Sequence, residues 1–80
     1  MQRELVRDGL LFALAQRYRE DPSHFLSLSK QAINSALTRQ IVAELKNEGH
    51  IEEEARGTIR FTPRGYRAFQ NDPLPYSFRN

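Results

Sequence analysis

The sequence predicts a mainly α-helical domain that carries one small β-hairpin, an α+β fold. Apolar residues recur at helical spacing over residues 3–20 and again over residues 35–48. A glycine at position 49 and a short run of alternating apolar residues follow, as expected for a helix end and a pair of short strands. The 80 residues suit one domain, 1–80, with a small core.

The first helix is expected over residues 3–20. Its apolar stripe, which includes Leu10, Leu14 and Tyr18, is broad, so we expect the helix to pack on two sides. Gly9 either weakens this helix by roughly 1 kcal/mol relative to Ala or allows another helix to approach closely. Pro22 cannot continue the helix and ends the segment.

Residues 23–48 are expected to form a helix-turn-helix unit, and two alternatives remain for its first half. In the first alternative, a short helix covers roughly residues 23–34 and turns near Gln31–Asn34. Asn34 or Ser35 then caps the next helix, because a short polar side chain accepts from free backbone N–H groups.

In the second alternative, one helix runs from Lys30 to Glu48 and is capped by Ser29. The apolar spacing fits both alternatives, because the core positions recur every four residues: Ile33, Leu37, Ile41 and Leu45.

The helix that ends at Glu48 is expected to stop at Gly49, where a left-handed backbone conformation costs glycine nothing. At 100° per residue, the side opposite its core carries no acid and two alanines. That side or its flank holds Ser35, Ala36, Arg39, Gln40, Ala43 and Lys46.

A hairpin is expected over residues 51–61, with strands Ile51–Glu54 and Thr58–Phe61 and a three-residue loop between them. In that register Glu52 faces Arg60, and Ile51 faces Phe61. A cross-strand ion pair contributes only a few tenths to about 1 kcal/mol. We therefore interpret the acidic run Glu52–Glu54 as a solvated strand face that partly neutralises nearby arginines.

The stretch "TPRGYRAF" predicts a short helix over residues 63–70. Thr62 suits the N-cap and Pro63 the first helical position, and Tyr66 and Phe69 are expected to be buried. The tail, residues 71–80, holds two prolines and three apolar residues and is expected to be irregular.

Composition argues against several classes of protein. There is no cysteine, and the two histidines have no partner at a metal-ligand spacing, so no metal site or cofactor is expected. No serine has a base at a useful spacing, so we do not expect an enzyme. No apolar run reaches the roughly 20 residues of a membrane span, and we expect a cytoplasmic protein.

Charge is unevenly distributed along the chain, although the net charge is only +2. Residues 22–54 carry three basic and five acidic side chains, whereas residues 55–71 carry four arginines and no acid. The positive charge therefore begins directly after the acidic run.

The stretches "LTRQIVAELKNEGHI" (37–51) and "IRFTPRGYRAF" (59–69) together resemble the winged helix-turn-helix family. In that family a recognition helix ends at a glycine before the first wing strand, and the second wing strand often runs into Thr-Pro-(Lys/Arg)-Gly. This chain departs from the family in its His50, its acidic first wing strand and its very short wing.

The resemblance implies a sequence-specific protein for double-stranded DNA, a small transcriptional regulator that reads the major groove with the helix ending at Glu48. It implies that Arg39 and Gln40 read bases, that Ala36 and Ala43 allow close approach, and that Arg56 enters a minor groove. The resemblance also assigns residues to phosphate contact: Lys46, Arg64 and Arg67. A homodimer through the first helix or the tail is expected.

The alternative is a winged-helix module that binds protein and not DNA. The small net charge, the acidic run and the apolar tail favour it. Residue types alone do not distinguish DNA from RNA or protein as the partner.

Overall fold

The computed structural model describes residues 2–71, and this part of the chain is mainly helical with a small antiparallel sheet. The expected α+β class is therefore confirmed. The elements are, in chain order, α1 (Gln2–Glu20), β1 (Leu26–Ser27), α2 (Lys30–Asn34), α3 (Ala36–Asn47), β2 (Ile51–Ala55), β3 (Thr58–Phe61) and α4 (Pro63–Asn71). The expectations for Leu74, Tyr76 and Phe78 lie outside the described residues.

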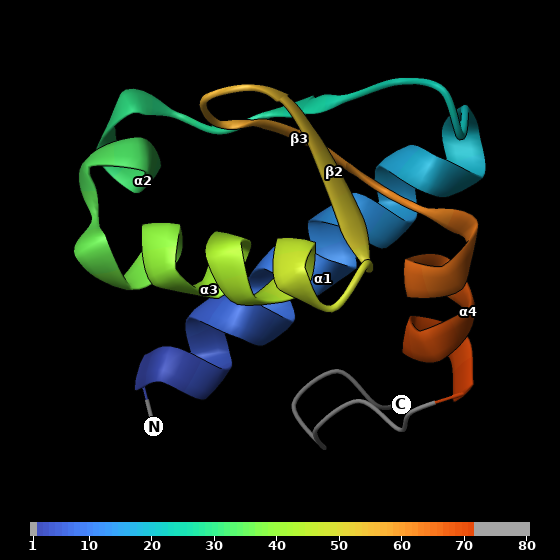
Figure 1. Cartoon of the computed structure of the whole chain (residues 1–80), viewed down its shortest axis with the longest axis horizontal. Helices are drawn as coiled ribbons and strands as arrows, with labels where there is room; N and C mark the ends of the chain where they lie inside the picture. Colours follow the sequence, from blue (N-terminus) through green and yellow to red (C-terminus); the bar gives the residue numbers. More distant parts are fainter. Residues whose placement is uncertain (1, 72–80) are drawn as a thin grey trace.

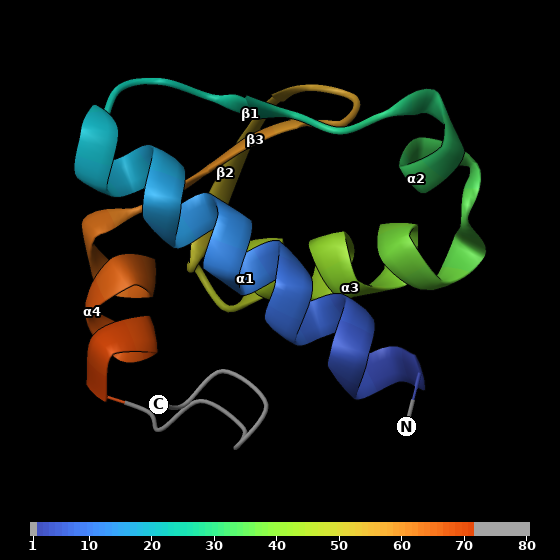
Figure 2. The ribbon, with the colours of Figure 1, turned by 180° about the vertical axis from the view of Figure 1, so that it is seen from behind.

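Helix α1 is the centre of the fold. It runs diagonally behind α3 in Figure 1 and in front of it in Figure 2, and it contacts α3, β1, β3 and α4. The expected packing on more than one side is confirmed, and it buries Leu10, Leu11, Leu14 and Ala15. Gly9 faces open space, with no atom within 4 Å of an added Cβ, so within the described chain it admits no neighbouring helix.

The expectation of a helix from residue 23 is wrong for residues 23–29. Leu26 and Ser27 instead form β1, which pairs antiparallel with β3, and the Leu28 N–H donates to the Gly57 carbonyl at 2.8 Å. Leu26 and Leu28 pack against the core while Ser27 is exposed. This alternation has the period of a strand. The free edge of β3 supplies the backbone hydrogen bonds that stabilise the strand relative to a helix.

The structure of residues 29–48 combines parts of both alternatives. Ser29 caps α2 by accepting from the Ala32 N–H at 3.1 Å, so the helix starts where the second alternative placed it. Ser35 has an extended backbone and accepts from the Thr38 N–H at 3.3 Å, so it interrupts the long helix and caps α3. The single helix from Lys30 to Glu48 is therefore wrong.

Helix α3 ends as expected at Gly49, whose φ is 77°. The Gly49 N–H donates to the Lys46 carbonyl at 3.0 Å and the His50 N–H to the Leu45 carbonyl at 2.9 Å. These two bonds form a Schellman motif, which requires a left-handed residue at the glycine position.

The expected hairpin register is confirmed, with Ile51 opposite Phe61 and Glu52 opposite Arg60. The expected three-residue loop is too long by one, because Ala55 pairs with Thr58 and a bulge follows Glu53. The sheet order is β1-β3-β2, so β3 lies in the middle.

The Thr-Pro-x-Gly segment joins the hairpin to α4. The Thr62 hydroxyl accepts from the Gly65 N–H at 2.9 Å and donates to the Gly49 carbonyl at 2.7 Å. A Cβ on Gly65 would lie 1.9 Å from the His50 carbonyl oxygen, so only glycine allows this approach. Tyr66 of α4 stacks on Tyr18 of α1 at 4.4 Å between ring centroids; it and Phe69 are only half-buried.

Candidate nucleic-acid interface

The outer side of α3 is exposed and carries no acid. The helix buries Thr38, Ile41, Val42 and Leu45. It exposes Ala36, Arg39, Gln40, Ala43, Lys46 and Asn47, while Ser35 is half-buried and serves as the N-cap. The acid within α3, Glu44, accepts from Arg3 of α1, so its charge is used inside the fold.

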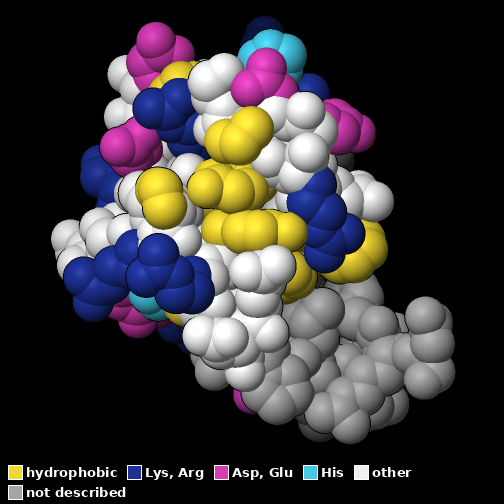
Figure 3. Space-filling model, turned by 90° about the vertical axis from the view of Figure 1, so that its right-hand side faces the viewer, with side chains coloured by type: hydrophobic (Ala, Val, Ile, Leu, Met, Phe, Trp, Pro, Cys, Tyr) yellow, Lys and Arg dark blue, Asp and Glu magenta, His cyan; other side chains and the backbone are white. Residues whose placement is uncertain are grey.

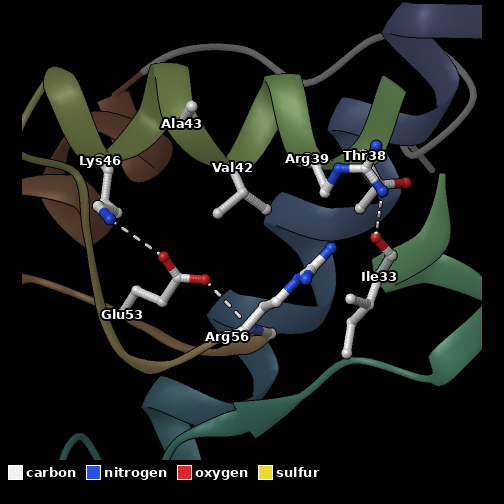
Figure 4. Close-up of a pocket in the computed structure, with 9 residues that line it drawn as sticks. Ile33, Thr38, Arg39, Val42, Ala43, Lys46, Glu53 and Arg56 are labelled. Carbon is white, nitrogen blue, oxygen red and sulfur yellow. Dashed lines mark hydrogen bonds and ion pairs between the residues drawn. The ribbon is translucent and has the colours of Figure 1, made fainter. Parts of the chain in front are cut away.

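The tip of the β2–β3 hairpin lies beside this helix, and a pocket of about 240 Å³ separates the two. Its lining includes Arg39, Ala43 and Lys46 of α3 and Arg56 of the hairpin tip, and Figure 4 shows Lys46 extending from α3 and Arg56 from the hairpin tip. Sequence reasoning predicted each of these four residues as a candidate site residue, and the fold brings them together.

Glu53 connects the hairpin tip to α3. Its Oε1 lies 3.1 Å from the Lys46 Nζ, and its Oε2 accepts from the Gly57 N–H at 3.1 Å. The side chain is only 18% exposed. The Gly57 N–H, and after it Lys46, lower the pKa of the Glu53 carboxyl below its ordinary value, so the group is ionised at neutral pH.

Sequence reasoning missed this role of Glu53. A signal was present in the alternation of the strand, which sends the middle glutamate of the run to the side opposite Glu52. Nothing in the sequence indicates that α3 lies on that side.

The two guanidiniums at the pocket differ in their surroundings. The Arg39 Nη1 donates to the Ile33 carbonyl at the end of α2, at 2.9 Å. Arg56 makes no hydrogen bond or ion pair within residues 2–71, and it is exposed. One arginine is thus positioned by the fold and the other extends from the hairpin tip.

The remaining predicted arginines lie on α4, outside the pocket. Arg64 is exposed, and its Nη1 lies 3.8 Å from the position of a Cβ on Gly49, beside the end of α3. Arg67 is exposed one turn further along α4.

Arg60 is held within the fold. Its Nε donates to Glu52 at 2.8 Å, its Nη1 donates to the Ser23 carbonyl at 2.9 Å, and its guanidinium lies 4.5 Å from the centre of the Phe25 ring. Glu52 therefore neutralises an arginine that is already fixed. The interpretation of the acidic run as a solvated strand face fits Glu52 and Glu54 but is wrong for Glu53, which bonds Lys46 and the Gly57 N–H.

Within residues 2–71, no three His, Asp or Glu side chains gather in a way that could hold a metal ion. In the same part of the chain, none of the helices has the length and apolar character needed to cross a bilayer. Comparison with models of known protein families, with curated proteins and with solved structures found no match.

Proposed function

We propose that this chain is a winged helix-turn-helix protein that binds double-stranded DNA in a sequence-specific manner and acts as a small cytoplasmic transcriptional regulator. The observation that carries the proposal is the acid-free outer side of α3 with the Arg56 tip beside it. An α-helix fits the major groove of B-form DNA, and an adjacent hairpin reaches the backbone or the minor groove. The element order and the pairing of β1 with β3 support the same proposal.

Each candidate residue has a role that its chemistry suits. Arg39 pairs with guanine and Gln40 with adenine, because both side chains offer two hydrogen bonds to a base edge. Ala36 and Ala43 let the helix approach or contact a thymine methyl group. Phosphate contacts, which give affinity without sequence information, come from Ser35, Lys46, Arg64 and Arg67. Arg56 enters a narrow minor groove.

Two of these side chains have partners that DNA must replace. Arg39 exchanges its bond to the Ile33 carbonyl for a base, and Lys46 exchanges Glu53 for a phosphate. Glu53 still accepts the hydrogen bond from the Gly57 N–H when Lys46 binds a phosphate, so the hairpin tip keeps its structure.

The test is a titration of duplex DNA at several salt concentrations. Three cationic phosphate contacts, from Lys46, Arg64 and Arg67, predict a slope of log K against log salt of roughly −3 on mixed-sequence DNA. An absence of binding at low salt would reject the proposal.

Arg39→Ala tests the placement of α3. It is expected to weaken binding to the preferred duplex by about 1–3 kcal/mol and to affect mixed-sequence DNA less. Arg17→Ala, which removes the same charge from α1, is the control. Equal loss on all sequences would assign Arg39 to a phosphate, and no loss would exclude α3 from the major groove.

A second candidate function is a module that binds another protein. The face built by α4 and the end of α1 shows hydrophobic side chains between Lys and Arg side chains in Figure 3, and on α1 Leu5 is 62% exposed. A second copy of the chain or a protein partner would cover such surfaces. Sedimentation of the wild type and of Leu5→Glu tests the homodimer, because a charge at this position is expected to dissociate it.

A further inference from the structure

We propose that the pocket between α3 and the hairpin tip binds a small aromatic carboxylate, and that this ligand competes with DNA for the two arginines at the pocket. The competition rests on the proposed function, whereas the binding of the carboxylate does not.

The pocket has an apolar interior of limited size. Its walls are the side chains of Ile33, Val42 and Ala43 and the backbone of Gly57. A Cβ on Gly57 would lie 2.5 Å from the Ile33 Cδ1, so the Ile33 side chain packs directly against the Gly57 backbone in this wall. A pocket of about 240 Å³ is smaller than those that hold drug-sized ligands and suits one or two aromatic rings.

The charges around the pocket select an anion. Three cations line it, Arg39, Lys46 and Arg56, against the single acid Glu53. Glu53 is already bound to Lys46 and to the Gly57 N–H, so it neutralises the lysine. Neither guanidinium forms a close ion pair among residues 2–71, although Arg56 lies near enough to Glu53 to help lower the pKa of its carboxyl.

The guanidiniums also share one side of the pocket. In Figure 4 the Arg56 side chain extends across the pocket toward Arg39, while Lys46 and Glu53 lie together on the other side. A carboxylate between the two arginines accepts charge-assisted hydrogen bonds from their N–H groups. The ring of the same molecule then lies on Val42 and Ala43, which removes apolar surface from water.

Such a ligand would regulate DNA binding. It occupies the space between the helix and the hairpin, and it neutralises Arg39 and Arg56, which the proposed function assigns to DNA. The negative charge of the bound carboxylate therefore repels the DNA phosphates that lie near α3 and the hairpin tip in the proposed complex.

The experiment follows backbone amide resonances of the full chain by NMR during a titration with 2-naphthoate in the absence of DNA. Saturable shifts are expected at Ala43, Arg56 and Gly57, with a Kd of roughly 0.1–1 mM for a ligand of this size. Acetate, which has no ring, and 2-naphthalenemethanol, which has no charge, are expected to bind at least about tenfold more weakly. Equal binding of the alcohol, or shifts that do not saturate, would overturn the proposal.

Two pairs of variants locate the site. Arg56→Gln is expected to weaken naphthoate binding by about tenfold, whereas Arg17→Gln on α1 leaves it unchanged. Ala43→Leu adds a bulky side chain at the edge of the pocket and is expected to weaken binding, whereas Asn47→Leu, also exposed on α3 but outside the lining, does not. The same loss in either control would place the ligand elsewhere and reject the site.

The competition is measured separately. At ten times its Kd, naphthoate is expected to lower the apparent DNA affinity of the wild type by about tenfold, whereas 2-naphthalenemethanol at the same concentration is expected to lower it by at most about twofold. DNA binding with no effect of naphthoate would reject the competition. Naphthoate binding without DNA binding would reject the proposed function and leave the ligand site standing.

Discussion

At the residue scale, Glu53 shows how one carboxylate connects two elements. One oxygen accepts from the backbone of the hairpin tip and the other pairs with a lysine of α3. Gly57 is buried, so its N–H needs a partner within the protein. The same acid that satisfies this donor fixes the distance between helix and hairpin and thereby shapes the pocket.

Replacing Glu53 by Gln is expected to lower the free energy of unfolding by about 1 kcal/mol at pH 7. The folded-state pKa of Glu53 is below its unfolded value of about 4.5. Its stabilisation is therefore complete above that value and is lost as the pH falls through the folded pKa. Urea unfolding at pH 7 and pH 3 measures both free energies.

The difference between the wild type and Glu53→Gln is thus expected to be larger at pH 7 than at pH 3. Glu54→Gln is the control, because that side chain is exposed and makes no hydrogen bond or ion pair within residues 2–71. An equal difference at both pH values would show that the charge of Glu53 does not stabilise the fold.

Gly65→Ala is expected to destabilise the protein by about 2 kcal/mol or more. The new methyl group would meet the His50 carbonyl oxygen at 1.9 Å, and backbone cannot move away as a flexible side chain can. Gly9→Ala is the matched control, since it meets no atom within 4 Å and is expected to stabilise the helix by up to about 1 kcal/mol. Thermal unfolding distinguishes them, and two melting temperatures shifted in the same direction would contradict the close packing of α4.

Local chemistry made several residue roles predictable from the sequence. Gly49 and the pairing of Glu52 with Arg60 depend on the helix end and on hairpin register, which neighbouring residues determine. The partners of Glu53 and the contact of Arg60 with Phe25 depend on segments brought together by folding, and no spacing in the sequence encodes them.

At the element scale, Ser35 decides that α2 and α3 are two helices. Its N–H donates to the Ala32 carbonyl at the end of α2, while its side-chain oxygen accepts from the Thr38 N–H and caps α3. The extended backbone at this residue turns the chain between the helices. The orientation of α3, and with it the exposed side proposed for DNA, follows from this turn.

Ser35→Ala is expected to lower the free energy of unfolding by about 1 kcal/mol, because the Thr38 N–H loses its acceptor. Ser27→Ala, in an exposed position of β1 outside any cap, is expected to change it much less. Chemical denaturation measures both. If the cap stabilises α3, hydrogen exchange at the start of α3 accelerates in Ser35→Ala alone, and unchanged exchange there would exclude that role.

The sequence predicted those elements whose apolar residues recur periodically and whose ends carry a proline or a glycine. Helices α1 and α3 have Pro22 and Gly49 at or near their ends, and the hairpin has alternating residues around a glycine. Strand β1 has only two residues, too few to show a period, and it exists because β3 offers it a free edge. The single signal was the alternation of leucine and serine over residues 26–29.

At the scale of the whole molecule, carboxylates of α3 and of the hairpin form ion pairs with basic side chains of the same chain. Glu44 pairs with Arg3, Glu52 with Arg60 and Glu53 with Lys46. Arg39 and Arg56, which form no close ion pair within residues 2–71, line the pocket, so the net charge of +2 understates the positive potential there.

Replacing both Glu52 and Glu54 by Gln tests whether this surface attracts DNA or a basic protein. The change raises the net charge from +2 to +4 without touching an arginine. Stability is expected to change little, because exposed ion pairs contribute only about 0–1 kcal/mol. DNA affinity is expected to rise by roughly twofold to tenfold at low salt, since two negative charges near the hairpin tip disappear.

The salt slope separates long-range attraction from new contacts. Arg60 remains bound to the Ser23 carbonyl and the Phe25 ring after Glu52 is neutralised. We therefore expect the slope to stay nearly constant, because the number of phosphates in contact does not change. A steeper slope would mean that Arg60 has moved to the DNA.

Glu4→Gln with Glu20→Gln is the matched control, because it removes the same charge from exposed positions near the two ends of α1. An equal gain in both double variants would assign the effect to net charge and not to the hairpin. If the partner is a basic protein surface, the Glu52 and Glu54 variant weakens binding, since these carboxylates are then contact residues. DNA affinity that is absent before and after the change would leave the protein-binding module as the function of this fold.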